Sequence, residues 1–72
     1  MIAGICSSTI SKVKKAIEIV ENNSQIDYYT RRTIIDMLKK LAVSLVEICK
    51  DHVQEGTLRE LKRLVKQLSE LE

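Results

Sequence analysis

The sequence contains no proline, phenylalanine or tryptophan, and it has only two glycines and two tyrosines among 72 residues. Because proline and glycine are the residues that most often interrupt regular structure, their scarcity favours long helices. The lack of aromatic side chains argues against a small-molecule pocket, whose walls usually contain aromatic rings. A core must then be built from Leu, Ile, Val and Ala, which suits contacts between helices.

The charges are nearly balanced, with twelve Lys and Arg residues against ten Asp and Glu residues. A net charge of +2 gives no strong attraction to nucleic acid or to a membrane surface. The apolar segment at residues 1–6 is too short to span a bilayer, and it lacks the pattern of a signal peptide. We therefore expect an intracellular, cytoplasmic protein that makes no membrane contact.

The two cysteines, Cys6 and Cys49, both lie among apolar neighbours, where a free thiol behaves as a small hydrophobic group. We expect both to be reduced and buried, as in a reducing compartment. Cys49 and His52 have a spacing that could bind a metal from one helix face, and Cys6 could join them. A structural zinc site needs four ligands, however, and a fourth is not evident. The sequence therefore predicts no metal and no cofactor.

Apolar residues repeat at the three-to-four spacing of helices in three segments. The pattern predicts an all-α domain over residues 1–72, with helices at about 9–22, 27–55 and 57–71. Residues 1–8 are expected to form an N-terminal arm.

Local residues indicate where these helices begin and end. Asn22 and Asn23 should end the first helix, because Asn tolerates the left-handed conformation. Asp27 should cap the second helix, and Gly56 should end it with a positive φ. Thr57 and Glu60 have the spacing of a capping box at the start of the third helix. The short junction predicts that this helix folds back antiparallel on the second.

The predicted helix lengths do not match. The central helix would be near 40 Å long, and its two neighbours about 20–24 Å each. Its apolar arc is also wider than one short neighbour can cover. We therefore expect a helical hairpin or bundle completed by oligomerisation, for example as a homodimer, although a compact three-helix monomer is the competing arrangement. The expected partner or self-association contacts are Ile34, Leu38, Leu41, Leu45, Val46, Ile48, Leu61, Leu64 and Leu68.

The function predicted from these features is non-enzymatic protein–protein interaction, as an adaptor or a self-association domain. No phosphate-binding loop, nucleophile motif or pair of carboxylates in an apolar cleft indicates catalysis, so neither an enzyme nor a small-molecule substrate is expected. Two exposed apolar residues, Ile19 and Met37, project away from the main apolar faces. They would mark a second binding patch if the fold brings them together.

A second hypothesis is a small nucleic-acid-associated or regulatory factor. Its phosphate or acidic-partner contacts would be Arg59, Lys62, Arg63 and Lys66, which share one stripe of the third helix. The same stripe is also typical of an ordinary solvated helix face.

A third hypothesis is a three-helix domain that binds a peptide between its second and third helices. The pair Arg31-Arg32 and the segment 61–66 (Leu-Lys-Arg-Leu-Val-Lys) resemble the BAG-type co-chaperone domain. That resemblance implies helices 2 and 3 that grip a chaperone, although the first helix expected here is much shorter than in that family.

One polar cluster stands at the start of the second helix, where Tyr28, Tyr29, Arg31 and Arg32 could bind an anion near the positive end of the helix dipole. We expect instead a polar rim, with Tyr28 packed into the core.

Overall fold

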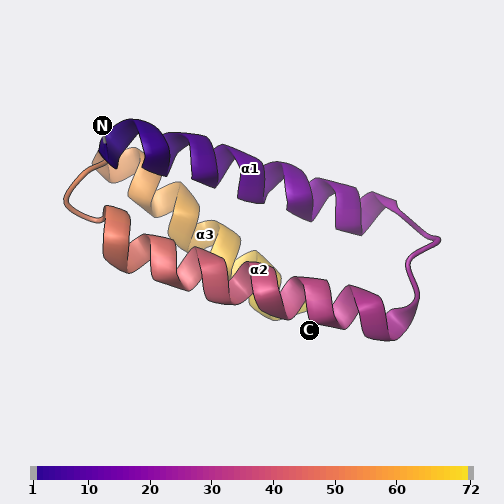
Figure 1. Cartoon of the computed structure of the whole chain (residues 1–72). Helices are drawn as coiled ribbons and strands as arrows, with labels where there is room; N and C mark the ends of the chain where they lie inside the picture. Colours follow the sequence, from indigo (N-terminus) through magenta and orange to yellow (C-terminus); the bar gives the residue numbers. More distant parts are fainter. Residues whose placement is uncertain (1, 72) are drawn as a thin grey trace.

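The computed structural model describes residues 2–71. It is a bundle of three helices, α1 (Ile2–Asn22), α2 (Tyr28–Cys49) and α3 (Glu55–Leu71). Successive helices run in opposite directions, and α3 lies behind α1 and α2 in Figure 1. The molecule measures 37 × 18 × 16 Å. The prediction of an all-α fold with three packed helices is confirmed, as is the return of α3 along α2.

The core consists of one apolar stripe from each helix. None of the described residues buries a polar or charged side chain. Leucines dominate the contribution of α3, and β-branched residues dominate that of α1, so the core is aliphatic as the composition predicts. The buried residues are Cys6, Ile10, Val13, Ile17, Val20, Ile35, Ala42, Leu45, Cys49, Leu61, Leu64 and Leu68.

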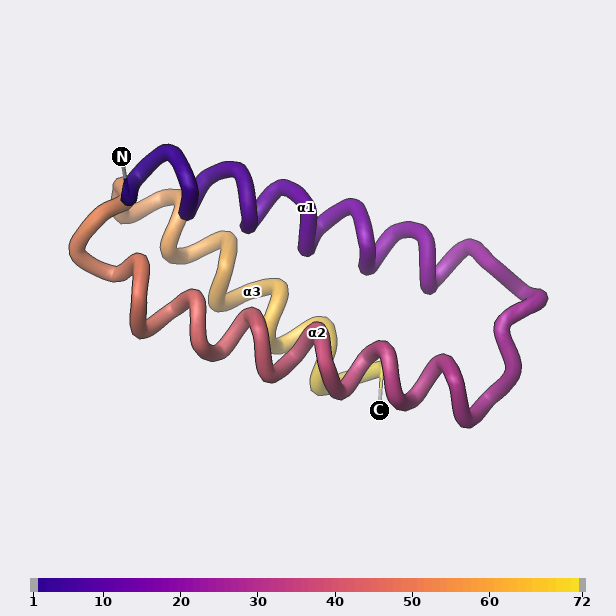
Figure 2. The backbone as a smooth tube through the Cα atoms, in the orientation of Figure 1, coloured from indigo at the N-terminus to yellow at the C-terminus, as the bar shows by residue number. Residues whose placement is uncertain are grey.

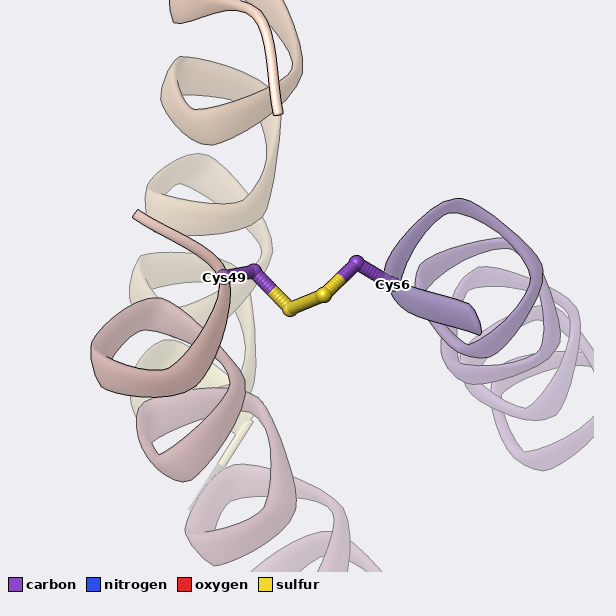
Figure 3. The surroundings of a disulfide bond; sticks show 2 residues. All are labelled: Cys6 and Cys49. Carbon is purple, nitrogen blue, oxygen red and sulfur yellow. A yellow bond between two sulfur atoms is a disulfide. The ribbon is translucent and has the colours of Figure 1, made fainter. Parts of the chain in front are cut away.

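The prediction of an N-terminal arm at residues 1–8 is wrong for residues 2–8, which form the first two turns of α1; residue 1 lies outside the described part of the chain. The reason is a tertiary link, because Cys6 is buried and forms a disulfide with Cys49 at the end of α2. The two Cα atoms are 5.9 Å apart, and Figure 3 shows the bridge between the two helices. The expectation of reduced thiols is therefore also wrong.

Helix α2 ends at Cys49, six residues before the predicted end at residue 55. The amide of His52 donates to the carbonyl of Cys49 (2.8 Å), which closes the helix with a tight turn. Val53, read from the sequence as part of the helix, is partly buried and packs against the core from this corner. This burial explains why Val53 continues the apolar spacing of α2, although it lies after the last residue of the helix.

Helix α3 begins at Glu55, two residues earlier than predicted. The amide of Leu58 donates to the carbonyl of Gln54 (3.1 Å), so Gly56 and Thr57 lie inside the first turn. No residue in the described range has a positive φ, which overturns the left-handed positions expected at Gly56 and at the end of α1.

The helix lengths are 21 residues for α1, 22 for α2 and 17 for α3. Helices α1 and α2 therefore lie alongside each other over nearly their whole length, as Figure 2 shows. The mismatch between one long helix and two short neighbours does not exist, so the argument for a second molecule that rested on length is wrong.

The predicted cap of α2 is confirmed. The backbone amide of Thr30 donates to Asp27 Oδ1 at 2.7 Å, and the Thr30 hydroxyl donates to Oδ2 at 3.0 Å. These bonds, the backbone one first, lower the pKa of Asp27 below its ordinary value of 3.8. The ionised carboxylate therefore fixes where α2 starts.

Candidate protein interface

Exposed apolar side chains gather on one flank of α2. The other flank faces α3, because a shallow hollow is lined by Val43 and Val46 of α2 and by Val65 of α3. At 100° per residue, Leu41 and Ile48 lie roughly 160° and 140° around the helix from Val43. They therefore lie at the edge of the buried stripe that is turned away from α3.

Helix α1 has the same arrangement. Its α3 flank is marked by Lys14, whose Nζ lies 3.1 Å from Glu60 Oε1, and by Glu21, which accepts from Gln67 Nε2 at 2.9 Å. Ile5 and Ile19 lie roughly 180° and 140° around the helix from Lys14. Both side chains are exposed, and they border the side of α1 that is away from α3.

The two flanks share one side of the bundle, which is turned toward the reader in Figure 1. We define the α1–α2 face as Ile5 and Ile19 of α1 together with Met37, Leu41 and Ile48 of α2. Their exposed fractions run from 43% at Leu41 to 67% at Ile5. The occurrence of five large apolar side chains on one side of so small a molecule makes this face a candidate interaction surface.

The predicted contact residues divide into three groups. Leu45, Leu61, Leu64 and Leu68 are buried inside the chain's own core, where they hold the helices together. Ile34, Leu38 and Val46 are partly buried against that core. Only Leu41 and Ile48 are exposed.

Sequence reasoning missed Ile5, because residues 1–8 were read as an arm. It set Ile19 and Met37 apart as a possible second patch, and both lie on the α1–α2 face. The helical spacing of Met37, Leu41 and Ile48 could have revealed the α2 half of this face once the core stripe was known.

The basic stripe of α3 lies on the outer surface, opposite the buried leucines. Arg59, Lys62, Arg63 and Lys66 are all exposed. Arg59 Nη2 lies 3.5 Å from Glu55 Oε1, and Glu60, the next residue in the chain, forms an ion pair with Lys14 of α1. Acidic side chains thus lie within and beside the stripe, and they reduce its positive potential.

The aromatic corner at the start of α2 differs from expectation. Tyr28 and Tyr29 are 61% and 80% exposed, so Tyr28 is not packed into the core. Their rings meet edge to face at 5.4 Å, and Arg32 lies over the Tyr28 ring. Arg31 donates to the backbone carbonyls of Val20 and Asn23 at the end of α1, and it is therefore occupied structurally rather than presented to an anion.

Other kinds of site find little support in the described part of the chain. The disulfide removes both thiolates as metal ligands, and residues 2–71 contain no group of three His, Cys, Asp or Glu side chains placed to hold a metal. None of the helices is long and apolar enough to cross a membrane. The α2–α3 hollow has a volume of about 240 Å³, below the roughly 300–1,000 Å³ usual for ligand pockets. A second hollow of about 420 Å³ lies within that range, but it is a shallow depression lined by residues of α2 alone.

Comparison with protein-family models, curated proteins and solved structures found no match for this chain.

Proposed function

We propose that this chain is a non-enzymatic interaction module that self-associates through the α1–α2 face. The observation that carries the proposal is the set of exposed Ile, Leu and Met side chains on the side of α1 and α2 that α3 leaves uncovered. The contact residues are then Ile5, Ile19, Met37, Leu41 and Ile48, with Ile34 at their inner edge.

The size of the face suits a dimer. A standard interface buries about 800 Å² on each partner, roughly a sixth of the 5161 Å² surface of this molecule. The broad side of the bundle, 37 by 18 Å, supplies an area of that order. In such a dimer the α1–α2 pair of one copy would stack on that of the other. The four helices would form two layers, with an α3 on each outer surface.

A second copy is the occupant we favour because a two-fold contact brings one patch against itself. Such a contact is tolerated when the patch carries few charges. Two charged residues, Lys12 and Lys15 of α1, lie beside Ile19 at this face, and the five defining residues themselves are apolar. The aliphatic stems of the two lysines can pack while their ammonium groups reach the rim of the contact.

The expected affinity is modest. Burying the exposed parts of five apolar side chains contributes on the order of 1 kcal/mol each, or roughly 10 kcal/mol for two copies. Association itself costs about 4–15 kcal/mol. The difference is at best about 6 kcal/mol, so we expect a dimer with a dissociation constant of roughly 40 μM or weaker.

Leu41→Glu is the variant that tests the face. It places a charge on the α1–α2 face, where a second copy would have to desolvate it. The dissociation constant of the dimer should therefore rise more than tenfold relative to wild type. Sedimentation equilibrium from micromolar to millimolar concentrations measures this. Leu45 is unsuitable for the test because it is only 7% exposed, so a charge there would disrupt folding.

Val43→Glu is the matched control. Val43 is two residues away on the same helix and is equally exposed, at 46% against 43% for Leu41, but it lies on the α3 flank. It should leave the dimer intact. A wild-type chain that stays monomeric throughout, or equal effects of the two variants, would overturn the proposal. A heterologous protein partner would be the next occupant to consider.

A nucleic-acid-associated role for α3 is the second candidate, because Arg59, Lys62, Arg63 and Lys66 are exposed together. We place it behind self-association because Glu55 and Glu60 offset part of this charge and the net charge of the chain is only +2. A co-chaperone-like or peptide-binding role is the third candidate. It has less support, because the buried leucines of α3 already occupy most of the contact with α2 where a peptide would bind. An intracellular location stays a prediction, and it no longer draws support from the cysteines.

A further inference from the structure

We propose that the Cys6–Cys49 disulfide is a redox latch that orders the first two turns of α1 and so controls one end of the α1–α2 face. The latch itself rests on the placement of the bridge, and its effect on assembly rests on the proposed function. Reduction should release residues 2–8 from the bundle while the rest of the fold persists.

The first two turns of α1 have one fully buried residue, and Ile2 on the same helix face is 49% exposed. Among residues 2–8 only Cys6 is buried, at 2% exposure, and all the others are exposed. The polar contacts between α1 and α3 involve Lys14 and Glu21, farther along the helix. Gly4, Ser7 and Ser8 are weak helix formers, so local propensity does not hold these turns.

The other end of the bridge is held independently. Cys49 is fully buried at the end of α2, and the preceding turn contributes the buried Leu45 and the partly buried Val46 to the core. When the bridge opens, α2 therefore stays in place, and the start of α1 is the part that frays.

The α1–α2 face ends at the latch. Ile5 precedes Cys6 in the chain, and Ile48 precedes Cys49, so the bridge brings these two exposed residues to the same end of the face. Fraying of residues 2–8 removes Ile5 from the surface that a second copy would meet.

The chemistry is thiol–disulfide exchange with a dithiol reductant. One thiolate of the reductant attacks a sulfur of the bridge and forms a mixed disulfide, and its second thiolate then displaces the remaining cysteine sulfur. Two electrons and two protons pass to Cys6 and Cys49, which become thiols, and the reductant becomes a cyclic disulfide. Because both sulfurs belong to buried residues, the attack follows transient fraying of the exposed first turn.

Residue-resolved ¹³Cα chemical shifts of the oxidised chain, and of the chain kept in dithiothreitol, test the latch. We expect the helical shifts of residues 2–8 to fall by at least half on reduction, while residues 10–22, 28–49 and 55–71 keep theirs. Unchanged shifts at residues 2–8 would overturn the latch, and so would a loss of helical shifts in all three helices.

Gly4→Ala and its control Gly56→Ala sharpen this test. A Cβ at either glycine meets no atom within 4 Å, so both substitutions fit their helices. Alanine favours a helix more than glycine does, so Gly4→Ala should recover part of the helical shifts of residues 2–8 in the reduced chain. Gly56→Ala should leave those shifts unchanged. Equal effects of the two variants on residues 2–8 would contradict the latch.

Sedimentation of the same samples tests the link to assembly. Reduction should weaken the dimer about fivefold or more. If the oxidised chain is monomeric, the proposed function fails while the chemical shifts still decide the latch. If the oxidised chain dimerises and reduction frays residues 2–8 without weakening the dimer, control of the face is refuted.

Discussion

Asp27 and Arg31 organise the corner between α1 and α2 from opposite directions. The carboxylate of Asp27 accepts hydrogen bonds from the first turn of α2, and the guanidinium of Arg31 reaches back to the end of α1. Each side chain satisfies backbone groups that a helix end leaves unpaired. A few polar residues thus join the ends of two helices whose buried surfaces, apart from the disulfide, are aliphatic.

The cap at Asp27 predicts a specific pH dependence. Its pKa is lowered in the folded state by hydrogen bonds from Thr30, so the ionised form stabilises the fold above pH 3.8. This stability is lost as the pH falls through the lower, folded-state pKa. The melting temperature of wild type should therefore fall relative to that of Asp27→Asn as the pH drops from 5 to 2, because Asn caps the helix without titrating.

Thermal unfolding by circular dichroism at several pH values checks the expectation. Asp27→Ala should be less stable than both chains at pH 7, because it has no acceptor for the Thr30 amide. A difference between wild type and Asp27→Asn that does not vary with pH would rule out the contribution of the carboxylate.

At the scale of elements, α1 ends without a basic residue in its last turn, and α2 supplies one. Arg31 Nη2 donates to the carbonyl of Asn23 at 2.6 Å, and Nη1 donates to the carbonyl of Val20. A cation at a helix C-terminus is favourable both as a donor and toward the helix dipole. The link between α1 and α2 thus has a polar clamp at one end and a disulfide at the other.

Arg31→Ala should lower the free energy of unfolding by about 1–2 kcal/mol, because two carbonyls lose a charged donor. Urea denaturation measures the loss. Arg31→Lys should recover only part of it, since an ammonium group cannot reproduce the two-pronged geometry. Full stability in Arg31→Ala would show that water replaces the clamp without cost.

The sequence predicted the type and number of the helices better than their ends. The apolar spacing of residues 10–20 predicted the buried stripe of α1, which includes Ile10, Val13 and Ile17. The apolar spacing of α3 was also read correctly, but its leucines were predicted as contacts with a partner, and they lie in the chain's own core. The ends were misjudged where a tertiary contact overrides local preference. The burial of Cys6 stabilises residues 2–8 as a helix that their own propensities do not favour. Val53 fits the helical apolar spacing although it lies after the end of α2.

The candidate interface was predictable only in part for the same reason. Leu41 and Ile48 belong to the apolar arc read from the sequence, but that arc mixed them with Leu45, which is buried within the chain. Periodicity shows which residues share a helix face. It does not show which portion of a wide face the chain's own helices cover, because that depends on how they pack.

At the scale of the whole molecule, the disulfide provides the reinforcement that the sequence reading assigned to oligomerisation. A core of this size seldom contributes more than about 3–5 kcal/mol. A bridge that closes a loop with a sequence separation of 43 residues constrains the unfolded chain by about 4 kcal/mol. The isolated bundle can therefore be stable without a partner, so any dimer is a matter of function and not a condition for folding.

Reduction should accordingly lower the free energy of unfolding of the chain by about 4 kcal/mol. Urea titrations with and without dithiothreitol measure the difference. The double variant Cys6→Ala, Cys49→Ala is the control, because its stability should not respond to the reductant. A loss below about 1 kcal/mol in wild type would mean that the loop closure contributes little.

The placement of the two tyrosines has an optical consequence. The chain has no tryptophan, and both phenol rings lie at the corner where α2 starts, largely in contact with solvent. Their ultraviolet absorption and emission therefore report on that corner and hardly on the aliphatic interior. A ligand or a second molecule that reaches this corner would change the tyrosine emission. Unfolding of the interior would be detected chiefly by the circular dichroism of the backbone.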